Sequence, residues 1–308
     1  MPAGARGRSG GVSGKHRTEY VLFCFFRGLI RRLPAGAAYR VLEMMALVMQ
    51  EGFGWRKQGT RERLREVFPE RSEEEREGIR REAVRNLARN MVDLIKGPES
   101  CGVQVEGADA LFKALERARE REKGVLLVIA HSGNWDHAGI VTARGGFPMC
   151  FIARHQKNSR MYRELIRARE EGGGTVVDRD DPRLIRKLLA FLAENGVVAI
   201  LVDIRARKAG DTYRFLGRTA WLGNGLGLLA AKSGAEVLPV YLGRDGRRLH
   251  FWKPLSPRRL KSGAVGKPER RALLQSCLDD LSAEILLRPE AYFWFNKRWV
   301  LEPFDEDV

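Results

Sequence analysis

His131 and Asp136 are the residues whose types and spacing best suit chemistry. His131 comes directly after the apolar run at residues 124–130, which is short and rich in β-branched residues, as buried strands are. Asp136 lies five residues later, early in an expected helix over residues 134–143. From there its carboxylate can reach one ring nitrogen of His131, which fixes the tautomer and leaves the other nitrogen free as a base. This pair predicts base-assisted attack by a hydroxyl group.

Other interpretations of these residues stay open. A histidine hydrogen-bonded at the edge of a sheet is common, but the order strand, His131, Gly, Asn, Trp, Asp136 favours a catalytic role. His137 is more typical of a solvated helix position. Since neither a cysteine nor a third well-spaced histidine joins this group, no zinc or other metal site is predicted.

Further polar residues follow other expected strands. Arg154 and Asp203 each come directly after one, with Asn158 and Arg205 close behind. An arginine in such a place can bind a phosphate through two hydrogen bonds, and the helix entry at Gly223–Gly225 can hold an anion on free amides. Because parallel strands end at a common edge, we expect these groups to lie near the histidine.

The composition indicates a globular protein with an anionic partner. The chain has 308 residues, a formal net charge of +16, 44% hydrophobic residues and 8% aromatic residues. Such a charge suits nucleic acid, an acidic carrier protein or an anionic lipid surface, although a general bias toward arginine produces it too. The four cysteines are far apart and form no CxxC pair, so we expect a reducing compartment and no disulfide framework.

Three regions are expected along the chain. Residues 1–17 are rich in Gly, Ser and Arg, predict a disordered tail and lack the features of a secretory signal. Residues 18–100 predict a helical region. Its apolar segment at 20–26 ends in a cluster of arginines and is too short to span a bilayer, which suits either a helix in the membrane interface or one packed on the protein itself. Residues 101–308 predict an α/β domain.

Strands and helices alternate in the expected α/β domain. This order predicts a mixed, largely parallel sheet flanked by helices, with an antiparallel edge hairpin and a helical N-terminal extension. A loop is expected over residues 203–222. Strands are expected at residues 103–106, 124–130, 149–153, 175–177, 197–202, 236–242 and 248–253, and helices at 37–50, 60–68, 72–96, 108–123, 134–143, 159–171, 181–194, 223–233 and 268–287.

The chain resembles the late (lauroyl and myristoyl) acyltransferases of bacterial lipid A biosynthesis and their relatives that acylate phosphatidylinositol mannosides. Both belong to the HxxxxD/E lysophospholipid acyltransferase superfamily. The resemblance spans nearly the whole chain. It is carried by His131–Asp136 as the HxxxxD motif, Arg154 with Asn158, Asp203, Phe215–Gly217, Gly234–Ala235 with Pro239, and the aromatic ending Arg288–Trp299.

The resemblance implies a glycerolipid acyltransferase-like fold and transfer of a fatty acyl group to a lipid hydroxyl. His131 would be the general base and Asp136 would orient it and stabilise its imidazolium form. The donor would be the thioester of an acyl carrier protein or of coenzyme A, with no cofactor. The acceptor would be a membrane glycolipid, first a lipid A precursor and alternatively a phosphatidylinositol mannoside. Substrate-binding residues would be Asn134, Arg154, Asn158, Asp203, Arg205 and Gly217.

The same resemblance places the protein at the cytoplasmic face of the bacterial inner membrane, peripheral or anchored by its apolar helix. Two departures bear on the acceptor: Asp136 stands where lipid A enzymes often have Glu, and Ile204-Arg205 follows Asp203 where many have Gln. Rival functions are a hydrolase, which would lack the GxSxG nucleophile motif, a non-catalytic membrane scaffold, and a nucleic-acid-binding protein. No helix-turn-helix or zinc pattern supports the last, so no nucleic-acid partner is expected.

Overall fold

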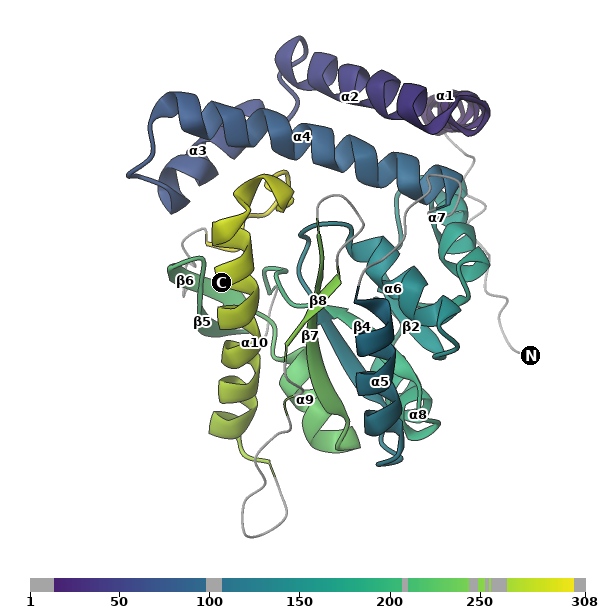
Figure 1. The fold of residues 1–308 in the computed structure, drawn as a ribbon, viewed down its shortest axis with the longest axis vertical. Coiled ribbons are helices and arrows are strands. Elements are labelled where there is room, and N and C mark those ends of the chain that lie inside the picture. Colours follow the sequence, from purple (N-terminus) through teal and green to yellow (C-terminus); the bar gives the residue numbers. More distant parts are fainter. Residues whose placement is uncertain are drawn as a thin grey trace, which may run out of the picture.

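Six strands form one mixed sheet in the order β3-β2-β4-β1-β7-β8, with helices on both faces (Figure 1). The computed structural model describes residues 14–97, 107–206, 210–243, 249–252, 255 and 265–301. All neighbouring strands are parallel except β7 and β8, which form the expected antiparallel edge. The predicted α/β class is therefore confirmed. The strands are β1 (Val125–Ile129), β2 (Met149–Ala153), β3 (Gly174–Asp178), β4 (Val197–Leu201), β7 (Glu236–Leu242) and β8 (Leu249–Phe251).

The central strand β1 is buried on both sides because its side chains alternate between two apolar cores. Leu126 and Val128 belong to one core, together with residues of α8 (Leu184–Ala193), α9 (Gly225–Ser233) and α10 (Lys267–Leu287). The other β1 side chains, Val125, Leu127 and Ile129, belong to the second core, with residues of α5 (Ala108–Arg119) and α6 (Trp135–Arg144). Strands covered on both faces are continuous apolar runs, which explains why this strand is evident in the sequence. Helix α7 (Ser159–Glu171) packs beside the edge strand β3.

A two-stranded hairpin replaces part of the loop predicted over residues 203–222. Strands β5 (Asp211–Phe215) and β6 (Arg218–Leu222) pair antiparallel. The two turn residues, Leu216 and Gly217, have φ values of 50° and 76°, as a two-residue hairpin turn requires. The loop prediction was wrong here because the turn lacks the usual Asn-Gly signal. The strand predicted at residues 103–106 lies outside the described residues.

A layer of four helices covers the loops that follow the strands (Figure 1). Helix α1 begins within the predicted disordered tail, so its start differs from the expectation, while residues 1–13 lie outside the described part of the chain. Helix α4 begins with the expected capping box of Ser72 and Glu75. None of the helices in the described ranges is long and apolar enough to cross a bilayer. The four are α1 (Gly14–Arg32), α2 (Ala35–Glu51), α3 (Lys57–Val67) and α4, the last spanning Glu73–Lys96.

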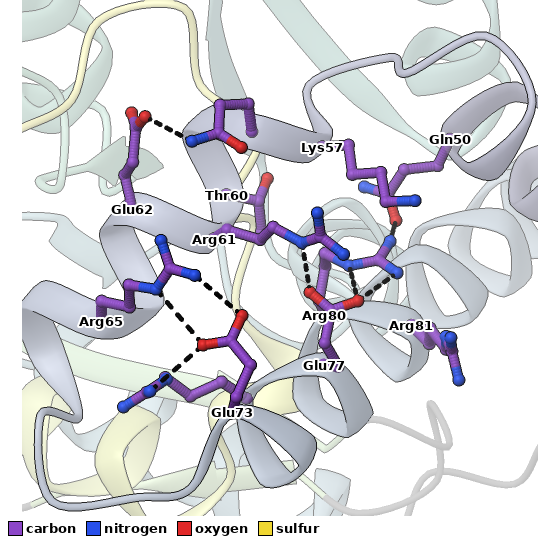
Figure 2. A network of polar contacts seen from close by, with 12 residues as sticks. Gln50, Lys57, Thr60, Arg61, Glu62, Arg65, Glu73, Glu77, Arg80 and Arg81 are labelled. Carbon is purple, nitrogen blue, oxygen red and sulfur yellow. Dashed lines mark hydrogen bonds and ion pairs between the residues drawn. The ribbon is translucent and has the colours of Figure 1, made fainter.

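A network of ion pairs joins α2, α3 and α4 (Figure 2). Its centre is Arg80, whose side chain is fully buried and donates to Gln50, Glu51 and Glu77. Hydrogen bonds from Arg61 and then Arg80 lower the pKa of Glu77 to about 2. The three helices are thus tied together by charge as well as by apolar contact, and we call these residues the α2–α3–α4 network.

Candidate active site

The histidine predicted as a base is held by a buried aspartate from the neighbouring strand. His131 Nδ1 lies 2.9 Å from Asp203 Oδ1, and the His131 backbone N–H donates to Asp203 Oδ2 at 2.9 Å. Strands β1 and β4 are adjacent and parallel with Ile129 opposite Leu201, so the positions two residues beyond each strand meet. Asp203 has no exposed surface, whereas 18% of the His131 side chain is exposed. The carboxylate therefore fixes the ring and leaves Nε2 as the available nitrogen.

Asp136 does not take the position predicted for it. Instead of hydrogen bonding to the His131 ring, its carboxylate accepts two hydrogen bonds from Arg169 of α7, at 2.9 Å from Nε and 2.7 Å from Nη2. The first turn of α6 directs Asp136 toward α7. The expectation that Asp136 orients the ring is thus corrected, since Asp203 does so. Asp136 still acts on His131 through space and favours its charged form.

The charges around His131 favour its protonated form. Burial alone would lower the pKa of the imidazole, but the opposing charge and hydrogen bond of Asp203 outweigh it and raise the pKa. Burial in turn raises the pKa of Asp203, and pairing with His131 outweighs that effect and lowers it. The buried Tyr292 hydroxyl adds to this lowering, although it lacks the geometry of an ordinary hydrogen bond. The pair is built to carry a positive charge on the ring.

The C-terminal segment holds the loop that carries His131. Phe293 N–H donates to the His131 carbonyl at 2.8 Å, and Gly133 N–H donates to the Ala291 carbonyl at 3.0 Å. The rings of Phe293 and Trp135 flank the imidazole, with centroid distances of 6.0 and 5.4 Å. This support was missed from the sequence, where the aromatic ending entered only through the resemblance.

Helix α4 supports the same loop through one polar face. Asn90 donates to the Gly133 carbonyl at 2.7 Å, and Asp93 accepts from Asn134 at 2.9 Å. Asn134 is buried and its other amide atom accepts from the His137 N–H, which caps α6. Both ends of the Asn134 amide are therefore engaged within the protein, where they support the loop. Its predicted contact with substrate stays a prediction. His137 is buried too, not solvated, and burial lowers its pKa to about 4.

His131 opens onto a cavity of about 550 Å³, here called the His131 cavity. Asp136, Arg154 and Arg205 line it with His131, so four of the predicted site residues meet around one space. Arg154 is exposed, and Arg205 donates to the Trp299 carbonyl at 3.2 Å. The remaining wall is largely aliphatic and includes Ile152, Leu184, Leu188, Ile200, Leu226 and Leu229. A histidine held by a carboxylate thus faces an apolar space that has arginines beside it.

Two predicted binding residues lie away from this cavity. Asn158 caps α7 and donates to the His16 carbonyl at 2.9 Å, in contact with α1. Gly217 occupies the turn of the β5–β6 hairpin near Arg271 of α10, where its positive φ suits glycine. Local backbone requirements explain both residue types, and the predicted substrate contacts of Asn158 and Gly217 stay predictions. Among the described residues, no group of three or more His, Cys, Asp or Glu side chains is placed to hold a metal.

The fold and site together define an α/β protein in which a carboxylate-held histidine faces an apolar cavity beside arginines. Comparison with known proteins gives this class a family. Residues 14–300 match the model of the bacterial lipid A biosynthesis acyltransferases, and the chain belongs to that family. The resemblance found in the sequence is thereby confirmed.

The curated relatives include proteins that differ in the acceptor they are named for. A phosphatidylinositol mannoside acyltransferase of Mycolicibacterium smegmatis is 26% identical over 202 residues, which are 64% of this chain and 62% of the relative. One of Mycobacterium tuberculosis strain H37Rv is 25% identical over 190 residues, 61% of this chain and 58% of the relative. A lipid A biosynthesis palmitoleoyltransferase of Escherichia coli K12 is 24% identical over 254 residues, 80% of this chain and 79% of the relative. The chain thus spans about six tenths of the length of the mycobacterial relatives.

Proposed function

We propose that the protein is an O-acyltransferase that moves a fatty acyl group from a thioester donor to a hydroxyl of a membrane glycolipid. The observation that carries this proposal is the His131–Asp203 pair at the wall of an apolar cavity. Family membership supports the reaction class. The donor is the thioester of an acyl carrier protein or of coenzyme A, and the net positive charge of the chain suits both anionic donors.

The geometry supports a general-base mechanism. Asp203 accepts from Nδ1–H, which leaves the lone pair on Nε2 to take the proton of the acceptor hydroxyl. The hydroxyl oxygen attacks the thioester carbonyl carbon, the tetrahedral intermediate breaks its C–S bond, and the imidazolium returns the proton to the leaving sulfur. Asp203 stabilises the imidazolium in between, as a triad aspartate does, with the substrate as nucleophile. No acyl-enzyme forms.

The side chains that line the His131 cavity suit two different parts of the substrates, the acyl chain and the phosphate. Aliphatic side chains from α8 and α9 form a space suited to the donor acyl chain, and Arg154, Arg179 and Arg205 can bind phosphate of the donor or acceptor. The acceptor is a membrane glycolipid. A lipid A precursor and a phosphatidylinositol mannoside are the two candidates that the family and the relatives suggest.

An apolar outer surface supports binding to the cytoplasmic face of the inner membrane. On α1, the side chains of Val21, Leu22, Phe25 and Leu29 are exposed at helical spacing, and Phe25 is 65% exposed. Exposed apolar side chains continue on α2 and the following loop. Large exposed apolar patches mark contact surfaces, and arginines beside them suit anionic headgroups. We call this surface the outer apolar surface, with members Val21, Leu22, Phe25, Leu29, Met44, Val48, Met49, Phe53 and Trp55.

The test is a product assay with the full chain and its His131→Ala variant. Each is incubated with acyl carrier protein and coenzyme A thioesters and a panel of acceptors that includes a lipid A precursor and a phosphatidylinositol mannoside. Mass spectrometry identifies the product. We expect one acylated acceptor, and a rate lower by about 10²–10⁴ in the variant, the usual contribution of a general base. Release of free fatty acid alone would indicate a hydrolase, and equal turnover by the variant would exclude the mechanism.

A further inference from the structure

A second cavity lies between α1, α4 and α7. Its volume is about 670 Å³, within the usual range for small-molecule sites. We call it the α1 cavity. None of its lining residues is needed for the chemistry proposed at His131. Its apolar side chains are Phe23 from α1, Met91, Leu94 and Ile95 from α4, and Met161, Leu165 and Ala168 from α7.

Polar contacts hold α1 over this cavity at both ends of the helix. Near its start, Asn158 donates to the His16 carbonyl at 2.9 Å. At its end, Lys96 donates to the carbonyls of Arg31 and Leu33 at 3.1 and 2.9 Å. Between these points, Arg27 pairs with Glu164 of α7. Tyr20 also donates to Glu164, at 3.1 Å. The helix is therefore attached near both ends and, between them, through Glu164, while an open space remains beneath it.

The interior of the α1 cavity favours a flexible apolar ligand. Met91 is 38% exposed although it lies on the cavity side of α4, and covering such an apolar side chain with a ligand is favourable. Met91 and Met161 supply adaptable, polarisable surface. Such a lining suits an unbranched hydrocarbon chain better than a rigid ring.

The rim of the α1 cavity is charged, and the cavity adjoins the proposed catalytic one. Arg31, Lys157 and Arg167 line it together with the acidic Glu19 and Glu171. Gln156 and Leu165 line both the α1 cavity and the His131 cavity. A molecule with its chain in the α1 cavity and its polar headgroup at this rim can therefore extend toward His131. The outer apolar surface of α1 lies on the other side of the same helix, next to the expected membrane.

We propose that the α1 cavity binds an acyl chain of the acceptor lipid, while the His131 cavity takes the chain of the donor. This inference rests on the proposed function, because that reaction needs two lipid chains near one histidine. The His131 cavity already supplies an apolar space for the chain that is being transferred. The acceptor, a lipid in its own right, brings further chains, and the α1 cavity is the adjoining apolar space for one of them.

Photo-crosslinking tests the site without requiring turnover. The His131→Ala chain is mixed with vesicles that contain a lipid A precursor or a phosphatidylinositol mannoside, each with a diazirine near the end of one acyl chain. The samples are then irradiated and mapped by mass spectrometry. We expect adducts on residues that line the α1 cavity and not the His131 cavity, namely Met91, Leu94, Ile95, Met161 and Ala168. Adducts confined to the outer apolar surface or to the His131 cavity, or no adducts at all, would overturn the proposal. Acyl transfer by the unmodified chain is measured separately, so failure of this site and failure of the reaction are distinguishable.

Filling the cavity gives the second test. Ala168→Trp places a large ring inside the α1 cavity, and the matched control Ala283→Trp places the same ring on an exposed position of α10. We expect Ala168→Trp to remove the adducts on α4 and α7. It should also raise the KM for the acceptor lipid about tenfold and leave the KM for the thioester donor unchanged. The control should behave as the parent chain. Adducts that persist in Ala168→Trp, or an equal loss for donor and acceptor, would contradict the proposal.

Discussion

At the scale of single residues, two aspartates near His131 have different partners and different roles. Asp203 bonds directly to Nδ1, whereas Asp136 is held by Arg169 and acts on the ring only through space. Arg169 also opposes the protonated form of His131 by its own charge. The Asp136–Arg169 pair is therefore expected to adjust the basicity of His131, while Asp203 sets its orientation.

Removing Arg169 should shift the pH dependence of the reaction. In Arg169→Gln, Asp136 loses its counter-charge and the ring loses a repelling cation, so both changes raise the pKa of His131 further. Because the base must be neutral, we expect the acidic limb of kcat/KM to move to higher pH. Arg163→Gln, an exposed arginine on the same helix, is the control and should leave the limb in place. A limb that moves to lower pH in Arg169→Gln would contradict this assignment.

At the scale of elements, the helical layer depends on the buried guanidinium of Arg80. The α2–α3–α4 network places Glu51, Glu77 and Gln50 around it, and α4 in turn carries Asn90, which holds the His131 loop. Loss of one partner from a buried ion pair leaves charges without compensation. Disruption of the α2–α3–α4 network is thus expected to shift α4 and with it the loop that carries His131.

We expect Arg80→Met to destabilise the protein by about 3–5 kcal/mol, the usual cost of breaking a buried ion pair. The matched control is Arg81→Met, next along α4, whose side chain is 56% exposed and 3.4 Å from Glu51. An exposed pair of this kind contributes about 0–1 kcal/mol. Urea unfolding of both variants followed by circular dichroism measures the difference. Equal unfolding midpoints in the two variants would show that the network contributes little.

The strands β1, β2 and β7 could be predicted from the sequence because they are buried on both faces and therefore form apolar runs. The hairpin β5–β6 could not, since its turn, Leu216-Gly217, lacks a strong signal and the expected loop covered it. Its alternation of buried Tyr213 and Phe215 with exposed Arg214 was present, but over only five residues.

Only part of the candidate site could be predicted, because the sequence reveals local patterns better than long-range contacts. His131 could be placed because it directly follows a recognisable strand. The identity of its partner depends on which strands are neighbours: β4 lies beside β1, and so Asp203, 72 residues away, meets the ring. Asp136 was preferred because it is close in sequence. The pairing of Ser132 with Tyr292 is equally long in range and has no local signal.

At the scale of the whole molecule, exposed apolar side chains gather on α1, α2 and the loop after α2, in the helical layer that also covers the site loops (Figure 1). Bilayer contact on this face would bring the lipid acceptor to the side of the molecule where α1 and α4 line a cavity next to His131. Membrane binding and acceptor access are therefore expected to depend on the same face.

Phe25→Glu should weaken binding to anionic vesicles, because it places a negative charge among the exposed apolar side chains of α1. The matched control is Leu287→Glu on α10, where the leucine is as exposed, at 69% against 65% for Phe25. We expect at least a tenfold loss of vesicle binding for Phe25→Glu in a sedimentation assay and little change for the control. Added salt should weaken vesicle binding by the parent chain, because arginines contribute to its attraction to anionic headgroups. Equal losses of vesicle binding in both variants would contradict membrane binding through the outer apolar surface.

The most direct measurement of the central claim is the pH dependence of kcat/KM for acyl transfer in the parent chain and in Asp203→Asn. The ion pair with Asp203 raises the pKa of His131 above its ordinary 6.5, so the parent should gain activity with rising pH through a limb above that value. Without the ion pair, burial lowers the pKa, and the limb should move below it. The plateau rate should also fall, by about 10²–10⁴ if the oriented base is lost. An unchanged limb and plateau in Asp203→Asn would contradict a histidine base held by Asp203.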